Sequence, residues 1–523
     1  MRLHFLGANR QVTGSRHYLD VGDTKILIDC GMFQERPYLD RNWEACPVPA
    51  DQIQAVILTH AHLDHCGLLP KLVREGFRGP VFTTPASADL AELILRDSAE
   101  IQAEDVAFKR KRHRKEGRRP KHPEVPLYTL EDVQHAMRRL EPIRYGQPVR
   151  ISDSVSATFH DAGHILGSSI VEVTVSQGGA IERIVFTGDL GQWNKPILRD
   201  PTMLSAADFI VMESTYGDRD HEVSEASDKE AELAALLREG MARGGNIVIP
   251  SFAVGRTQEI LYDISLLLEE KSVPGLETVP VYIDSPLGIA ATQIFEDSSH
   301  NYYDEEATAY QAEGVKFFSF STLVIAQTAE ESKEINFDPR QKIIISSSGM
   351  CEAGRIKHHL KHNLWRADST VLFVGYQAVG TLGRSILDGS KSVKIFGEEI
   401  QVKAAIEQLE GFSGHADQAG LLEWIGHFPA TVERVFVMHG EESVCAVFAG
   451  ELKKRGYPAV VPGMFETYDT ESFAQVPAAA VREAEPAVDV LSLVRARLES
   501  ADEAQAARMR EDLLALLRRW EER

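Results

Sequence analysis

The first 210 residues alternate short apolar, β-branched runs with turns rich in Gly, Asp and His. Such runs bounded by turn residues are typical of buried β-strands. They predict strands at 24–31, 55–62, 79–85 and 183–191. Between residues 86 and 109 the apolar positions recur at helical spacing, which predicts a helix. The segment is therefore expected to form a sheet whose strands end in polar loops.

From residue 209 onward, most apolar runs are followed by a helical pattern. These runs lie at 208–215, 245–261, 279–286, 342–350 and 370–376. Strand–helix repeats are the pattern of βαβ units, so this segment predicts a mainly parallel sheet covered by helices. Near residue 393 the first pattern returns, and it ends with an apolar run at 434–442.

The C-terminal segment has a different pattern. Pro462, Pro477 and Pro486 mark a linker, and apolar residues between Val488 and Trp520 recur at helical spacing. This spacing predicts two amphipathic helices. Packing or dimerisation is their expected role rather than catalysis, so a homodimer is one interpretation.

Composition and charge narrow the function classes. No apolar run approaches the roughly 18 residues needed to span a bilayer, so we expect no membrane association. The five cysteines form no CxxC pair and the N-terminus lacks a signal-peptide pattern, which favours the cytoplasm. The net charge of −22 argues against a polyanionic partner, but residues 109–121 hold nine Lys or Arg against one Glu. A nucleic-acid surface would therefore be local.

The most informative segment is THAHLDHCG, at residues 59–67. His60, His62 and Asp64 alternate along an extended turn, so their side chains can converge on one side, and His65 adds a fourth ligand. Imidazole nitrogens with one carboxylate suit Zn²⁺, which tolerates low coordination numbers. The segment therefore predicts a zinc site.

Further polar residues end or follow predicted strands elsewhere in the chain. They are Asp29, His164, Asp189 and His439. Each alone could be an ordinary turn residue. Together they indicate a site at the carboxyl ends of the strands, which would complete the ligand set. His160 is better explained by a local structural role.

HAHLDH with His164, Asp189 and a late histidine resembles the metallo-β-lactamase superfamily. The resemblance implies an αββα sandwich and two Zn²⁺ ions per chain. The implied ligands are His60, His62 and His164 for one ion, and Asp64, His65 and His439 for the other. Asp189 would bridge the ions, and Asp29 would orient the cluster without binding a metal.

The spacing of these ligands narrows the resemblance. Asp189 and His439 are 250 residues apart, and the strand–helix segment fills this gap. The arrangement resembles the β-CASP branch, whose members are nucleic-acid nucleases. Glu213 in VMESTYGDRDH and His415 in GFSGHADQ match two of its motifs. The resemblance covers about residues 1–465 and is closest to bacterial and archaeal relatives of the endonuclease subunit that cleaves eukaryotic pre-mRNA 3′ ends.

The implied fold class is α/β, a metallo-β-lactamase αββα sandwich with an inserted β-CASP α/β domain of mainly parallel sheet, plus a short helical C-terminal tail. The sandwich would comprise 1–208 and 393–465. The β-CASP domain would span 209–392, and the linker and tail 466–523.

The implied activity is that of a zinc-dependent endoribonuclease that hydrolyses phosphodiester bonds of single-stranded RNA. Asp64 or Asp189 would help to hold the nucleophile. His415, oriented by Glu213, would be the general acid for the leaving 3′-oxygen. The alternative for His415 is helix capping or a core imidazole.

Several residues are expected to contact substrate phosphates. Ser347, Ser348 and Gly349 follow a predicted strand and precede a helix, so their backbone N–H groups could cradle a phosphate. Arg256 and Arg384 could bind phosphate, or could equally form ion pairs within the domain. The basic run at 109–121 could contact RNA or be a solvated face.

Three other functions remain open. A 5′-to-3′ exoribonuclease of the RNase J type would need a tight 5′-monophosphate pocket. A small-molecule thioester or lactone metallohydrolase shares the histidine cluster, although the insertion and the basic run count against it. A metal-free scaffold subunit of a processing complex is the third, although every expected ligand is present.

Overall fold

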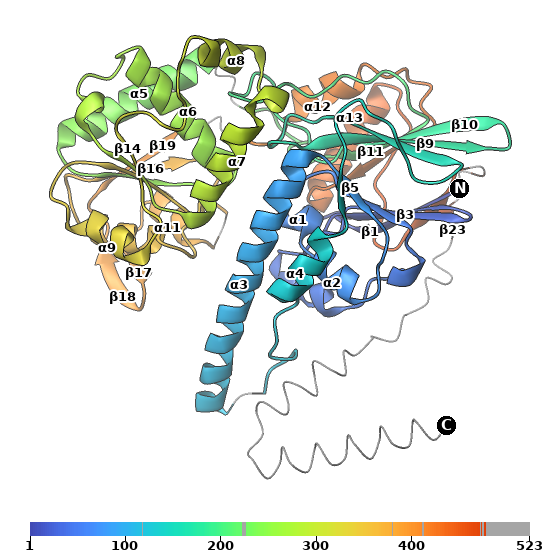
Figure 1. Ribbon diagram of the computed structural model, residues 1–523, viewed down its shortest axis with the longest axis horizontal. Coiled ribbons are helices and arrows are strands. Elements are labelled where there is room, and N and C mark those ends of the chain that lie inside the picture. Colours follow the sequence, from blue (N-terminus) through green and yellow to red (C-terminus); the bar gives the residue numbers. More distant parts are fainter. Residues whose placement is uncertain are drawn as a thin grey trace.

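The computed structural model describes residues 1–476 except 118, 222–225, 379, 410–412, 471, 473 and 474. Two of its sheets face each other, and a third forms a separate lobe (Figure 1). The helices predicted between residues 488 and 520 lie outside the described residues. None of the described helices is long and apolar enough to cross a membrane.

The first sheet has the strand order β23-β22-β1-β2-β3-β4-β5-β6. Its strands are β1 (Arg2–Gly7), β2 (Arg16–Val21), β3 (Thr24–Ile28), β4 (Ala55–Ile57), β5 (Val81–Thr83), β6 (Leu140–Pro142), β22 (Thr467–Asp469) and β23 (Gln475–Val476). Strands β3 to β6 run parallel. The strands predicted at 24–31, 55–62 and 79–85 are confirmed, but each is shorter than its apolar run.

The second sheet has the order β21-β20-β11-β10-β9-β8-β7. Its strands are β7 (Val149–Arg150), β8 (Val155–Asp161), β9 (Ser169–Gln177), β10 (Ala180–Phe186), β11 (Phe209–Glu213), β20 (Arg434–Met438) and β21 (Ala459–Val460). Because β10, β11 and β20 are parallel, their carboxyl ends meet at one edge of this sheet.

The inner faces of the two sheets share one apolar core. Alternate residues of each strand point to the same face, and Phe5, Ile28, Phe159 and Phe186 are among those buried between the sheets. The helices outside the sheets are α1 (Leu63–Cys66), α2 (Leu69–Arg74), α3 (Pro85–Glu116), α4 (Leu130–Met137), α12 (Gln418–Ile425) and α13 (Glu442–Lys454). Helices α1 to α4 belong to the core outside the first sheet, and α12 and α13 to the core outside the second. The predicted αββα sandwich is confirmed.

The third sheet is entirely parallel and has the order β14-β13-β15-β12-β16-β19. Its strands are β12 (Ile247–Pro250), β13 (Val281–Ile283), β14 (Leu323–Ile325), β15 (Ile343–Ser346), β16 (Thr370–Val374) and β19 (Ala405–Leu409). The helices of this lobe are α5 (Ala226–Arg243), α6 (Arg256–Glu269), α7 (Pro286–Tyr302), α8 (Glu305–Ala312), α9 (Ala329–Phe337), α10 (Ile356–Asn363) and α11 (Leu382–Leu387). A hairpin of β17 (Ser392–Ile395) and β18 (Glu398–Gln401) and the short 3₁₀ helices Arg36–Trp43, Ala50–Gln52 and Leu276–Thr278 complete the described elements.

Both faces of the central strands of this third sheet are buried. Ile247 and Ile249 of β12 belong to the core that includes α5 and α6, whereas Val248 belongs to the core that includes α9, α10 and α11. A strand covered on both faces needs apolar residues at every position, which explains the continuous apolar runs. The prediction of a mainly parallel, helix-covered sheet is confirmed.

The strand partners place the domain junctions elsewhere than expected. β11 lies within the predicted segment 209–392 but pairs with β10 and β20 of the sandwich. β19 follows residue 392 but pairs with β16 of the third sheet. β22 and β23 fall in the expected linker but extend the first sheet. The expected boundaries differ from these pairings because periodicity indicates a strand but not its partner.

The long helix α3 determines where the basic run lies. It has 32 residues, which corresponds to about 48 Å at 1.5 Å per residue. Its N-cap residue, Thr84, donates a hydrogen bond to the carbonyl of Gly167, and its other end extends away from both lobes (Figure 1). The basic run begins in the last two turns of this helix, so it lies far from Gly167 and its neighbour His164.

Candidate metal centre

The predicted ligands converge because several strands end at the same place. Asp29 follows β3, Asp189 lies shortly after β10, and His439 follows β20, while Glu213 is the last residue of β11. His60, His62, Asp64 and His65 lie on the loop after β4 and on α1. Asp29 and His439 have positive φ values of 60° and 50°. Such values are uncommon for residues other than glycine, and they turn the chain sharply at the strand ends.

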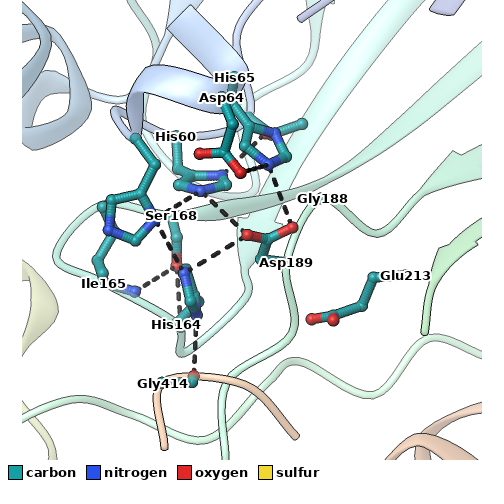
Figure 2. Close-up of polar contacts among 12 residues, drawn as sticks. His60, Asp64, His65, His164, Ile165, Ser168, Gly188, Asp189, Glu213 and Gly414 are labelled. Atoms are coloured by element: carbon teal, nitrogen blue, oxygen red, sulfur yellow. Dashed lines mark hydrogen bonds and ion pairs between the residues drawn. The ribbon is translucent and has the colours of Figure 1, made fainter. Parts of the chain in front are cut away.

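A first group of ligand atoms surrounds one carboxylate oxygen of Asp189. His60 Nε2 and His164 Nε2 each lie 3.2 Å from His62 Nδ1. Asp189 Oδ2 lies 3.4 Å from His60 Nε2 and 3.6 Å from His164 Nε2. Figure 2 shows His60, His164 and Asp189 pointing toward one another from separate segments of the chain.

A second group surrounds the other oxygen of the same carboxylate. Asp189 Oδ1 lies 3.3 Å from His65 Nε2 and 3.6 Å from His439 Nε2. His65 Nε2 and His439 Nε2 are 3.2 Å apart, and Asp64 Oδ2 lies 3.5 Å from His439 Nε2. The structure therefore brings all seven predicted ligands together: His60, His62, His164 and Asp189 form one group, and Asp64, His65 and His439 form another. Asp189 contacts both groups, through Oδ2 and Oδ1 respectively.

The spacing within both groups fits a metal ion. A tetrahedral zinc with ligands at about 2.0–2.1 Å separates neighbouring ligand atoms by about 3.3–3.4 Å, close to most of the separations here. Asp189 Oδ1 is also buried without a hydrogen-bond partner among the described residues. A buried carboxylate oxygen rarely lacks a partner, so its position suits a cation.

A set of outer contacts orients the ligands. Asp29 Oδ2 lies 2.8 Å from His65 Nδ1, and Asp29 Oδ1 accepts the Thr59 N–H at 2.8 Å. Such contacts position the histidine rings of metal sites, and that role of Asp29 stays a prediction. His160 Nε2 pairs with Glu172 at 3.2 Å, a local contact within the second sheet.

Three outer contacts escaped the sequence analysis. Thr59 Oγ1 lies 3.1 Å from His60 Nδ1, and Thr215 Oγ1 lies 3.1 Å from His439 Nδ1. His164 Nδ1 contacts the Gly414 carbonyl at 2.8 Å (Figure 2). Thr59 precedes His60 directly and could have been suspected. Gly414 is 250 residues from His164, and no local pattern identifies a backbone carbonyl.

Burial and charge separate the pKa values of the ligands. Burial, helped by the neighbouring His65, lowers the pKa of His60 to about 3. Burial also lowers the pKa of His62 to about 4. For His65, burial opposes the charged form, but Asp189 and Asp29 outweigh it and raise the pKa. Neutral imidazoles are the form that binds metals, so His60 and His62 are in that form at neutral pH.

Glu213 and His415 form a pair beside the metal ligands. His415 Nδ1 lies 3.2 Å from both carboxylate oxygens of Glu213, and 4.0 Å from Asp189 Oδ2. Burial opposes protonation of His415, but Glu213 outweighs it and raises the pKa to about 9. The adjacent α12 is capped instead by Asp417, whose Oδ1 accepts the Gly420 N–H. His415 is therefore not the helix cap that was its alternative.

The residues expected to contact phosphates lie in the third-sheet lobe. Ser347 to Gly349 follow β15, but α10 begins only at Ile356. The segment is therefore not the first turn of that helix. Arg256 is buried and pairs with Glu259, and Arg384 Nε donates to Asp388 at 2.8 Å. Both arginines thus form ion pairs within their domain.

Lys195 was also missed by the sequence analysis. It is buried, and its Nζ lies 2.8 Å from Glu259 of α6 and 2.9 Å from the carbonyl oxygen of His164. The ammonium group therefore joins the third-sheet lobe to a predicted metal ligand. No local pattern distinguishes Lys195 from a surface lysine.

Family models match three segments of the chain. A metallo-beta-lactamase superfamily domain matches 18–211, a Beta-Casp domain matches 257–386, and a Zn-dependent metallo-hydrolase RNA specificity domain matches 399–462. The fold and the two ligand groups define a metal-dependent hydrolase of the metallo-β-lactamase superfamily. More narrowly, the chain belongs to the β-CASP family of that superfamily.

Individual relatives agree with this assignment. Ribonuclease TTHA0252 of Thermus thermophilus is 38% identical over 456 residues, which are 87% of this chain and 97% of that protein. Transcription termination factor FttA of Methanocaldococcus jannaschii is 33% identical over 470 residues, covering 87% of this chain and 69% of that protein. A crystal structure of a protein of unknown function from Enterococcus faecalis V583 has a TM-score of 0.53 at 13% identity. The match covers 89% of this chain and 99% of the Enterococcus faecalis chain, and the two share the fold.

Proposed function

We propose that the protein is a zinc-dependent endoribonuclease that cleaves single-stranded RNA and holds two Zn²⁺ ions per chain. One observation carries this proposal: Asp189 offers one oxygen to each ligand group, and the Glu213–His415 pair lies against the same carboxylate. The match to an RNA specificity domain and the relative named as a ribonuclease support RNA as the substrate.

His60, His62 and His164 would hold one zinc ion, and Asp64, His65 and His439 the other, with Asp189 between them. Two zinc ions in such a site supply a bound water of lowered pKa and a positive charge for the oxygens of the reacting phosphate. Asp29 and the other outer contacts fix the ring orientations. The site would then be ordered before substrate arrives, which reduces the reorganisation needed during the reaction.

The chain's own groups would handle the nucleophile and the leaving group. The side chain of Asp64 is 16% exposed, more than those of the other carboxylates in the site, so it can help to position the nucleophile. Glu213 holds His415 through Nδ1, which leaves Nε2 to face the substrate. From there His415 would donate a proton to the leaving 3′-oxygen, as a general acid.

The phosphates beyond the scissile bond would contact the third-sheet lobe. Ser347, Ser348 and Gly349 remain our proposal for this role. The Ser347 hydroxyl lies 2.7 Å from that of Ser285, so hydroxyls from two adjacent strand ends are close together. Arg384 would contribute from the partly exposed α11. The buried Arg256 would act only through a rearrangement of its ion pair with Glu259.

The test uses zinc-replete protein and single-stranded RNA with either a 5′-triphosphate or a 5′-monophosphate. We expect internal cuts that do not depend on the 5′ group. His415→Ala should reduce kcat by about 10²- to 10⁴-fold, the usual contribution of a general acid. His160→Ala is the matched control, because this histidine pairs with Glu172, and it should leave kcat unchanged.

Other outcomes point to the competing functions. Digestion that proceeds from a 5′-monophosphate end would indicate a 5′-to-3′ exoribonuclease. Hydrolysis of thioesters or lactones without RNA cleavage would indicate a small-molecule hydrolase. Purified protein that binds no zinc would support a scaffold role. Absence of RNA cleavage by zinc-replete protein would refute the proposal.

Location and assembly are also proposals. The five cysteines are buried and unpaired, which supports a reducing cytoplasm. We propose a homodimer from the apolar pattern at 488–520, which lies outside the described residues. Sedimentation of the full chain and of a chain ending at residue 476 tests whether the C-terminal segment is needed for a dimer. Identical sedimentation of both as monomers would exclude a dimer formed through the C-terminal segment.

A further inference from the structure

Two exposed aromatic side chains lie where strands of the third sheet end. Phe252 comes two residues after β12 and is 48% exposed, and Tyr376 comes two residues after β16 and is 58% exposed. Because β12 and β16 are adjacent and parallel, both rings lie at the carboxyl edge of the sheet. Large aromatic groups left in solvent at one edge indicate a contact surface.

The topology of the sheet also places a switch point at this edge. The chain leaves β12 through α6 toward β13, and it leaves the adjacent β16 through α11 toward β19, in the opposite direction. Adjacent strands whose connections run in opposite directions form a switch point, where open α/β sheets bind ligands. Phe252 and Tyr376 come two residues after these two strands. Both aromatic residues therefore lie at the switch point, and the Ser347–Gly349 segment follows β15, the other neighbour of β12.

Local contacts place the Phe252 ring and the Tyr376 backbone beside that segment. A Cβ atom at Gly349 would lie 3.0 Å from two ring carbons of Phe252, so the ring lies against the backbone there. Gln377 Nε2 donates to the carbonyls of Gly349 and Tyr376, at 3.0 and 3.3 Å. Within the part of the chain that the structure describes, the Ser348 hydroxyl is buried without a hydrogen-bond partner.

The segment from Phe252 to Gly255 approaches the metal centre. A Cβ atom at Gly255 would lie 3.8 Å from Cγ2 of Ile165, and Ile165 directly follows the predicted ligand His164. Phe252 is three residues from Gly255. A nucleic-acid strand that leaves the metal ligands along this segment would therefore meet the Phe252 ring first.

We propose that Phe252 and Tyr376 form a base-stacking subsite for nucleotides next to the scissile phosphate. The proposal rests on the proposed ribonuclease function and identifies how that site would hold unpaired bases. Aromatic faces stack on any base, so the subsite would favour single-stranded over double-stranded RNA without reading sequence. Ser347 to Gly349 would contact the backbone of the same nucleotides.

The chain offers matched control residues. Phe337 is 78% exposed at the end of α9, and Trp365 is 55% exposed between α10 and β16. Each precedes a strand of the parallel sheet, so both lie at the amino edge, opposite to Phe252 and Tyr376. These aromatic residues are as exposed as Phe252 and Tyr376 but lie at the other edge of the sheet.

The experiment measures kcat and KM for cleavage of a single-stranded RNA oligonucleotide by the full, zinc-replete chain. Phe252→Leu keeps an apolar side chain but removes the aromatic face, and Phe252→Trp restores one. We expect Phe252→Leu to raise KM by about 5- to 150-fold, the range found for loss of one stacked base. Its kcat and zinc content should stay unchanged, and Phe252→Trp should recover most of the affinity. Phe337→Leu should have no effect.

Abasic RNA identifies the stacked nucleotide. Single abasic positions are scanned across the cleavage site with wild-type protein and with Phe252→Leu. At the stacked position, the abasic RNA and the substitution should have losses that are not additive. Equal KM values for Phe252→Leu and wild type would overturn the subsite. If the substitution changed the sedimentation of the protein while KM stayed the same, the exposed aromatic residues would bind protein rather than RNA. If wild type cleaves no RNA, the proposed function fails instead, and RNA binding measured by fluorescence anisotropy decides the subsite separately.

Discussion

Substitution of Gly31 tests whether the ligand loop depends on one close backbone contact. Gly31 lies two residues after Asp29, against the backbone of Asp64. A Cβ atom at Gly31 would lie 1.6 Å from the Asp64 carbonyl oxygen and 2.7 Å from the Ser15 nitrogen. The Asp64 carbonyl accepts the Ser15 N–H at 2.8 Å, and the Gly31 N–H donates to the Ser15 carbonyl at 2.9 Å. No flexible side chain is present to absorb the overlap.

The size of the effect follows from these distances. The Asp64 carbonyl must move by at least about 1.4 Å to reach the 3.0 Å below which real Cβ contacts are essentially not found. A displacement of about 1 Å at reacting groups can cost about 100-fold in rate. Overpacking of this kind destabilises a fold by about 1–3 kcal/mol. We therefore expect Gly31→Ala to lose zinc from the Asp64, His65 and His439 group, and to lose at least about 100-fold in kcat/KM.

The assay combines zinc content by mass spectrometry, RNA cleavage and urea unfolding. Gly450→Ala is the control, because a Cβ atom at Gly450 in α13 would meet no atom within 4 Å. That substitution should add up to about 1 kcal/mol of stability, as Ala does in a helix, without changing zinc content. Full zinc content and wild-type cleavage in Gly31→Ala would refute the argument that this contact positions the ligand loop.

Two further predictions concern charge. Burial, helped by Glu259 and Glu230, raises the pKa of Asp263 to about 8, above the unfolded value of about 3.9. The native state therefore binds the Asp263 proton more tightly than the unfolded state does. The stability that this proton contributes is fully present below pH 4 and is lost as the pH rises to about 8. Asp263→Asn should remove that loss. The free energy of unfolding of the variant relative to wild type should therefore rise by up to about 1.4 kcal/mol per pH unit in this window. Urea unfolding at pH 5, 6.5 and 8 that gives the same difference between variant and wild type at each pH would contradict the burial argument. The α3 residues Arg114 and Lys115 lie near the end of a helix about 48 Å long, so changing both to Gln should weaken binding of long RNA and reduce its salt dependence. Binding of short oligonucleotides should stay unchanged, and equal weakening for both lengths would place the basic run near the metal centre instead.

The local pattern predicted elements more reliably than it predicted their neighbours. The strand β12 and the helix α3 were expected because burial and periodicity are properties of consecutive residues. The same pattern assigned β11 to the inserted domain, although it pairs with β10 and β20. Hydrogen bonding between strands joins residues that are far apart in the chain, so a strand's own residues do not identify its partner.

The candidate site shows the same division. His60, His62, Asp64 and His65 are consecutive or nearly so, and their types alone suggested a metal site. Arg256 could not be assigned from its own segment, because its pairing with Glu259 in a buried environment depends on how α6 packs. The charge of the basic run is likewise evident from the sequence, but its position relative to the site is not. In the structure the run begins at the end of α3 that lies far from the site.

Thus the amino-acid sequence alone determined which side chains could bind a metal and which short segments form strands and helices, since both depend on residue type and local spacing. The tertiary structure decided that Asp189 faces both ligand groups at once, and that His164 contacts the Gly414 carbonyl. It also decided that Phe252 lies against Gly349 at the carboxyl edge of the third sheet. Each of these contacts joins segments that are about 100 to 250 residues apart or that meet only when several strands end at one edge. Only the folded chain brings such segments within reach of one another.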